Sequence, residues 1–207
     1  MPTPVIDTYF DCSSPWTYLG FEGVIPMAER LGVSIHWKPV LVGGVFNAVN
    51  PSVYESRKAP VKAKARYHAK DLKDWARLSG LSIKMPPSVF PVNSVKVMRA
   101  CILLQPEGKL VDFARAAFQL YWTEDKDISQ DDVIAEICTR AGVDAAQVFE
   151  GIQTAAIKDA LRENTEALIA RGGFGSPTFF VGDDIYFGND RLVLVEAVLR
   201  QADKTAV

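Results

Sequence analysis

Apolar and polar positions divide the chain into an alternating first part, a long helical middle and a strand-rich end. Residues 5–10 and 33–40 have the short apolar pattern of strands. Between them, apolar side chains recur at helical spacing from Ser14-Pro15 to Gly32. Proline fits the first turn of a helix, and glycine often follows the last turn. The pattern therefore predicts a β-α-β unit.

The middle of the chain has helical spacing that is broken by turn residues. Gly43-Gly44 and residues 47–51 predict a long loop. Residues 129–132 resemble a capping box at the start of one helix, and Asp144 is placed to cap the next one. The expected helices cover residues 62–79, 94–104 and 111–122, a segment after Ser129, a short segment after Asp144, and a last segment closed by Gly172-Gly173.

The end of the chain returns to strands. Residues 178–181 and 185–187 flank Gly182-Asp183-Asp184, which suits a hairpin turn. A final helix follows Asn189-Asp190. Because the helical middle is too long for a loop, we expect it to be a subdomain inserted into an α/β fold.

Two segments far apart in the chain indicate the type of α/β fold. Residues 14–17 read SPWT, follow the first strand and open a helix, and Ser176-Pro177 directly precedes a later strand. This is the arrangement of thioredoxin-like folds, whose redox members have cysteines at both ends of the tetrad. We therefore predict a thioredoxin-like domain, β-α-β … β-β-α, over residues 1–42 and 173–207, with a large all-helical insertion over residues 43–172.

Ser14 is the main candidate for chemistry. It stands where the redox members have their nucleophilic cysteine, and Thr17 replaces the second one. A helix start presents unpaired N–H groups and a partial positive charge, which stabilise an anion such as a thiolate. A serine hydroxyl there would donate a hydrogen bond to a thiolate that another molecule brings. The alternative is that Ser13 or Ser14 only caps the helix.

Other residues of the predicted site region also have structural alternatives. Cys12 is either a nucleophile or a small buried side chain, and we predict that it is dispensable because it has no partner cysteine in the tetrad. The Ser176-Pro177 peptide is expected to be cis. That form would present the backbone of Ser176 to a peptide-like ligand, which would pair with it as an added strand.

Several polar and charged residues could contact a ligand or have only a structural role. Asn189 and Asp190 either cap the last helix or approach a ligand ammonium group. The cations at positions 62, 64 and 66 form a solvated helix face unless one of them reaches a ligand carboxylate. We interpret His36 and His68 as structural or surface residues.

Composition narrows the classes of function. The net charge of −2 gives no electrostatic reason to bind nucleic acid or an anionic membrane. No apolar run approaches the ~20 residues that span a bilayer. Cys12, Cys101 and Cys138 have neither a Cys-x-x-Cys pair nor the spacing of metal ligands, so we expect no metal site. Their number and spacing are consistent with a reducing cytoplasm.

Four motifs carry a resemblance to a known family. The segments FDCSSPWTYLGFE from residue 10, FPVNS at 90–94, FGSPTFF at 174–180 and FGNDRL at 187–192 resemble 2-hydroxychromene-2-carboxylate isomerases. These enzymes are similar to kappa-class glutathione transferases and belong with a broader disulfide-oxidoreductase-like group. The resemblance runs from residue 5 to about residue 200. The chain departs from the common family pattern at Cys12 and Ser13, where bulkier apolar residues are frequent.

The resemblance implies glutathione as the bound cofactor, in a homodimer. It implies that the glutathione sulfur lies beside Ser14 and that the backbone of Ser176, before Pro177, pairs with the cysteinyl unit. It places Asn189 and Asp190 at the γ-glutamyl end. It also matches Lys64 with a lysine that meets the glycyl carboxylate, and Asn50 with an asparagine that approaches the ligand.

The function implied by the resemblance is a glutathione-dependent isomerisation in the breakdown of aromatic compounds. In the family reaction, glutathione thiolate adds to a cis-benzylidenepyruvate, the former double bond rotates, and elimination gives the trans product. A kappa-like transferase that conjugates electrophiles is the alternative enzyme, and a glutathione-binding module without catalysis is the alternative of another class. Four aromatic residues are candidates for a wall beside the substrate ring, with core packing as their other role: Trp16, Phe46, Phe90 and Trp122.

Overall fold

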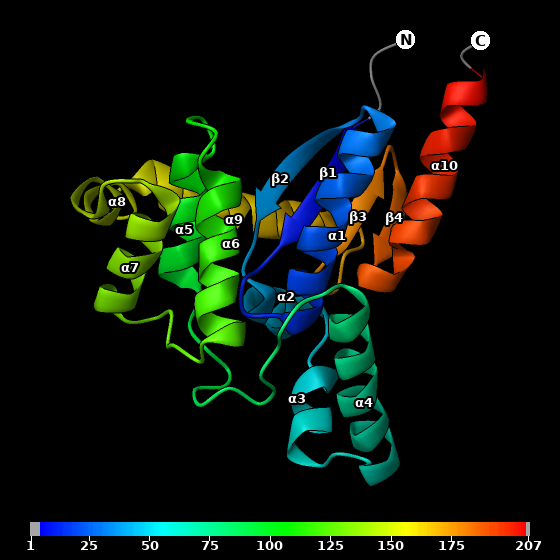
Figure 1. Cartoon of the computed structure of the whole chain (residues 1–207), viewed down its shortest axis with the longest axis horizontal. Coiled ribbons are helices and arrows are strands. Elements are labelled where there is room, and N and C mark those ends of the chain that lie inside the picture. Colours follow the sequence, from blue (N-terminus) through cyan, green and yellow to red (C-terminus); the bar gives the residue numbers. More distant parts are fainter. Residues whose placement is uncertain (1–4, 206–207) are drawn as a thin grey trace.

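A four-stranded mixed sheet forms the centre of the molecule (Figure 1). The computed structural model describes residues 5–205, with side chains described to residue 201. Strands β1 (Val5–Phe10), β2 (Ser34–Pro39), β3 (Thr178–Val181) and β4 (Asp184–Phe187) are arranged in the order β2-β1-β3-β4. Strand β1 is parallel to β2 and antiparallel to β3, and β3 forms the predicted hairpin with β4. The predicted thioredoxin-like α/β fold is confirmed.

The two faces of the sheet are covered by different helices. On one face, Ile6, Phe10 and Phe179 belong to the main apolar core, which includes residues of α1 (Pro15–Leu31) and α10 (Leu192–Thr205). On the other face, Tyr9 and Phe180 pack in a smaller core with residues of α2 (Val42–Val49) and α9 (Ala155–Ala170). This alternation follows from the period of two in a strand, which sends successive side chains to opposite faces.

The chain between β2 and β3 is helical, as predicted. Helices α5 to α8 lie beside the β2 edge of the sheet, whereas α3 and α4 project away from it (Figure 1). The boundaries of the inserted subdomain stay a prediction. The further elements of this part are α3 (Ser52–Lys58), α4 (Lys62–Leu78), α5 (Val95–Leu104), α6 (Leu110–Phe118), the π-helical turn η1 (Gln119–Thr123), α7 (Asp131–Ala141) and α8 (Ala145–Gly151).

Two local predictions were wrong. Helix α2 occupies most of the expected long loop, which was marked by residues 43–51. The Asp11 carboxylate accepts a hydrogen bond from the Val42 N–H at 2.8 Å and so caps this helix from outside. The capping box at Ser129 does not form. Helix α7 begins after Gln130 without a side-chain cap, and the Ser129 N–H is bonded to Asp127 instead. The predicted cap at Asp144 is confirmed, because its carboxylate accepts hydrogen bonds from the N–H groups of Ala146 and Gln147 in α8.

No helix in residues 5–205 combines the length and the apolar character needed to cross a membrane.

Candidate functional site

A pocket of about 1010 Å³ lies at the start of α1. Its wall comes from five regions of the chain: the turn between β1 and α1 with the first residues of α1, helices α2 to α4, residues 85–95, the segment before β3, and Phe187 at the end of β4. Ser14 and Ser176, predicted as partners in one site, both line it. The fold therefore brings together the two sequence segments from which the thioredoxin-like fold was predicted.

Ser14 caps α1 and also contacts the segment before β3. Its Oγ accepts a hydrogen bond from the Thr17 N–H at 3.2 Å, so the capping role weighed from the sequence is confirmed. The same hydroxyl donates to the Ser176 carbonyl oxygen at 3.3 Å. Ser14 as a residue is half-buried and lines the pocket.

Two backbone donors at this point have no partner within the described part of the chain. Neither the Trp16 N–H, in the first turn of α1, nor the N–H of Ser176 is hydrogen-bonded there. Ser176 is buried, and a buried N–H without a partner is costly unless a ligand or water satisfies it. The two free donors therefore suit a ligand that brings hydrogen-bond acceptors, such as an anion or a peptide backbone.

The Ser176-Pro177 peptide is cis, as predicted, and two further cis X-Pro peptides follow Met85 and Phe90 in the pocket wall. Helix α1 passes close to this proline. A Cβ atom added at Gly20 would lie 2.9 Å from Pro177 Cγ, so the missing side chain at Gly20 allows this contact.

Asp11 is the buried carboxylate of the site, and sequence reasoning missed it. Burial raises its pKa, although hydrogen bonds from the N–H groups of Ser13 and Val42 oppose the rise. Its own N–H donates to Ser176 Oγ at 3.1 Å, and Thr17 shares a 2.8 Å hydrogen bond with the same hydroxyl. Asp11 thus fixes three segments of the pocket to one another. An acidic residue directly after an apolar strand was the available signal.

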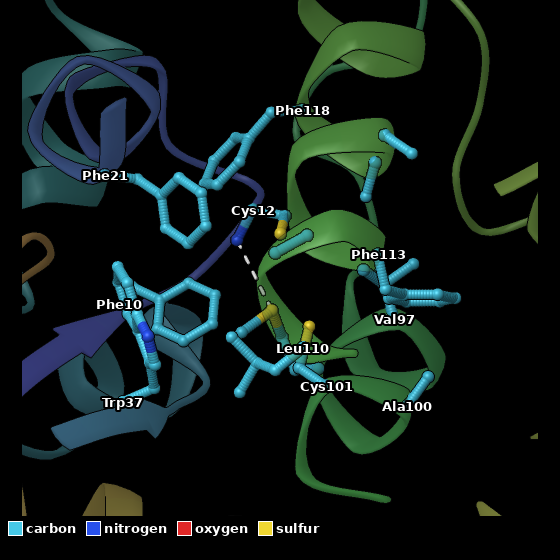
Figure 2. Packing of buried hydrophobic residues seen from close by; sticks show 14 of the residues in the cluster. Phe10, Cys12, Phe21, Trp37, Val97, Ala100, Cys101, Leu110, Phe113 and Phe118 are labelled. Atoms are coloured by element: carbon cyan, nitrogen blue, oxygen red, sulfur yellow. Dashed lines mark hydrogen bonds between the residues drawn. The ribbon is translucent and has the colours of Figure 1, made fainter. Parts of the chain in front are cut away.

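Cys12 is buried away from the pocket. Its N–H donates to the Met98 sulfur at 3.4 Å, and Figure 2 shows it with Cys101 among apolar side chains. Burial, with Cys101 as the next cause, raises the pKa of the Cys12 thiol well above its ordinary value. A buried thiol with a raised pKa is a poor nucleophile. The geometry therefore favours the structural interpretation of Cys12.

Of the other residues predicted to contact a ligand, Asn50 lines the pocket and the remaining three do not. The Asn50 amide donates to the Phe174 carbonyl oxygen at 3.2 Å. Lys64 is exposed on α4 and is not part of the lining, although its neighbour Ala65 is. Asn189 and Asp190 form a short 3₁₀ turn that contacts α1 outside the pocket lining. The roles of these residues toward glutathione stay predictions.

The pocket wall is strongly aromatic. Trp16, Phe46 and Phe90 line it, as the sequence suggested. Trp122 does not, because its ring is fully buried and its indole N–H donates to the Cys12 carbonyl oxygen at 2.9 Å. His68, interpreted as a structural or surface residue, is exposed and also lines the pocket.

Arg57, on α3, is a second lining residue that the sequence did not reveal. No motif surrounds it, and its position in the wall depends on how α3 packs in three dimensions. Among the described residues, no group of three or more His, Cys, Asp or Glu side chains is arranged to hold a metal ion.

Comparison with known proteins finds relatives that match nearly the whole chain. The chain is 28% identical to a 2-hydroxychromene-2-carboxylate isomerase of Pseudomonas putida, over 94% of each protein. It is 27% identical to glutathione S-transferase kappa 1 of Rattus norvegicus, over 96% of this chain and 92% of that one. A solved structure of a 2-hydroxychromene-2-carboxylate isomerase superposes with a TM-score of 0.82 at 25% identity, over 98% and 97% of the two chains. The family model of the DSBA-like thioredoxin domain matches residues 5–200, and the chain therefore belongs to that family.

Proposed function

We propose that the protein is a glutathione-dependent isomerase that converts 2-hydroxychromene-2-carboxylate to trans-o-hydroxybenzylidenepyruvate. The observation that carries this proposal is Ser14, a hydroxyl at the helix start in the place of the redox cysteine, beside the backbone of Ser176 in one pocket. The similarity to proteins named as these isomerases supports the reaction.

The chain's own groups have defined tasks in this proposal. Glutathione supplies the thiolate that adds to and leaves the substrate alkene. The free Trp16 N–H donates a hydrogen bond to the sulfur, and the Ser14 hydroxyl turns its single proton from the Ser176 carbonyl oxygen to the sulfur. Both hydrogen bonds lower the pKa of the glutathione thiol. The backbone of Ser176 aligns the cysteinyl unit, and Asn50, directly after α2, approaches the ligand. The aromatic wall excludes water and faces the ring of the substrate.

A kappa-like transferase is the second candidate, because the similarity to glutathione S-transferase kappa covers nearly the same length of chain. Both activities require the same bound thiolate. The acceptor that fits the pocket distinguishes them.

One assay tests both candidates. The absorbance of 2-hydroxychromene-2-carboxylate is followed with and without glutathione, beside 1-chloro-2,4-dinitrobenzene as a transferase electrophile. An isomerase should consume the chromene only when glutathione is present and should restore the glutathione at the end. Conjugation without isomerisation would favour the transferase. Glutathione binding without either reaction would indicate a binding module, and no binding at all would refute the proposal.

The expected homodimer and the cytoplasmic location belong to the same proposal. Sedimentation of the full chain at several protein concentrations measures the oligomeric state directly.

A further inference from the structure

The charged side chains that line the pocket have unequal access to a ligand. Asp11 is buried, and both oxygens of its carboxylate accept hydrogen bonds from backbone N–H groups. Arg57 is exposed. Within the part of the chain whose side chains are described, no carboxylate forms an ion pair or hydrogen bond with its guanidinium group. Arg57 is thus an available cation in a largely apolar pocket.

Aromatic rings hold the guanidinium group of Arg57 at the wall. Its central carbon lies 5.3 Å from the centre of the Phe90 ring and 5.8 Å from that of Phe46. Both distances are within the range of a cation–π contact. Tyr54, one turn earlier on α3, packs edge-on against the same Phe46 ring at 6.3 Å. Contacts with rings leave the N–H donors of the guanidinium group open to a planar anion.

We propose that Arg57 is a specificity-determining residue of this site and selects acceptors in which a carboxylate is attached to a flat apolar body. The carboxylate would accept the paired N–H groups of Arg57, while the body lies against Phe46 and Phe90. This inference rests on the proposed function, in which a second substrate enters the pocket beside glutathione. Glutathione has no flat apolar part to place on these rings, so the acceptor is the better occupant.

Binding of two matched probes tests the proposal without any reaction. The probes are 2-naphthoate and its neutral amide, 2-naphthamide, titrated into the full chain in the absence of glutathione. Arg57→Met should weaken the binding of the acid by about 10- to 100-fold, the range expected when a charged hydrogen bond is lost. The binding of the amide should change less than about twofold.

Lys58→Met is the matched control, because Lys58 is the exposed neighbour on α3 and does not line the pocket. It removes the same charge from the same helix and should leave both probes unaffected. Thermal melting should show that both variants are folded, since both side chains are exposed.

The outcomes separate this inference from the proposed function. Equal loss for the acid and the amide, equal binding of both by the wild type, or a loss of the same size in Lys58→Met would overturn the role of Arg57. A loss of glutathione affinity alone in Arg57→Met would also overturn it. Failure of the chromene assay with intact, acid-selective binding would instead refute only the isomerase reaction.

Discussion

At the scale of single residues, Ser14 combines two roles that a substitution can separate. Its hydroxyl caps α1 through the Thr17 N–H, and it faces the pocket in which we place the thiolate. An Ala at a cap position costs about 1 kcal/mol of stability, whereas Gly costs only a few tenths. Both substitutions remove the hydroxyl.

We expect Ser14→Ala and Ser14→Gly to raise the pKa of bound glutathione by the same amount. Loss of a hydrogen bond to a charged group costs roughly 1.5–3 kcal/mol, and each pKa unit corresponds to about 1.4 kcal/mol. The ultraviolet absorbance of the thiolate, measured against pH, reports this shift. Ser13→Ala serves as the neighbouring control. An unchanged thiolate pKa in both Ser14 variants would remove the serine from the mechanism.

Cys12 should be dispensable for activity. Cys12→Ala should retain most of the rate, because the thiol is fully buried and burial raises its pKa. Native protein should also react slowly with thiol reagents at Cys12 until it unfolds. Cys12→Ser should keep activity but lose stability, by about 1–3 kcal/mol if the hydroxyl finds no partner in the apolar site. A 100-fold loss of rate in folded Cys12→Ala would contradict the borrowed-thiol mechanism.

At the scale of elements, the segment between α4 and α5 carries Phe90 and other residues of the pocket wall, and Asp125 anchors it. The Asp125 carboxylate binds the Lys84 ammonium group and accepts the Ser88 N–H at 2.6 Å. Lys84, followed by Ser88, lowers the pKa of Asp125 to about 2. The backbone of Asp125 has a φ of 62°, which Asp and Asn tolerate better than most residues do.

Asp125 should make stability depend on pH at the acid end. A pKa that is lower in the folded state favours the ionised form, so the stabilisation is present above pH 4 and is lost as the pH falls toward 2. Asp125→Asn should therefore flatten the fall of unfolding free energy between about pH 4 and pH 2. Asp183→Asn, at an exposed position of the hairpin turn, is the control. Identical slopes for wild type and Asp125→Asn in urea unfolding would contradict this anchor.

At the scale of the whole molecule, the sequence correctly predicts the elements that depend on residues close together in the chain. The first strand, the Ser14-Pro15 helix start and the β3–β4 hairpin are local features, and all three were predicted. Helix α2 was not, because the carboxylate that caps it comes from Asp11, 31 residues earlier. The position of Arg57 likewise depends on a ring that comes later in the chain, at Phe90.

The place of Trp122 also depends on a contact with a distant residue, which local sequence does not show. Trp122 connects the helical part of the molecule to the part that contains the sheet. The sequence offered it as a wall residue, but it lies in the π-helical turn η1 and hydrogen-bonds to the Cys12 carbonyl oxygen, 110 residues away. This bond links the helical part to the turn that carries Ser14. The geometry at Ser14 therefore depends on how the helical part packs against the sheet.

Trp122→Phe should consequently affect stability and glutathione binding together. The change removes the indole N–H and leaves the Cys12 carbonyl oxygen buried without this donor, which costs about 1–3 kcal/mol in addition to the lost packing. Tyr121→Phe is the matched control, because it also removes one hydrogen bond from η1, the one to the Val89 carbonyl oxygen at 2.8 Å. Both variants should unfold at lower urea concentration, but only Trp122→Phe should weaken glutathione binding in titration calorimetry, since only that bond reaches the turn before Ser14. Native glutathione affinity in Trp122→Phe, or an equal loss in both variants, would show that this bond does not position the site.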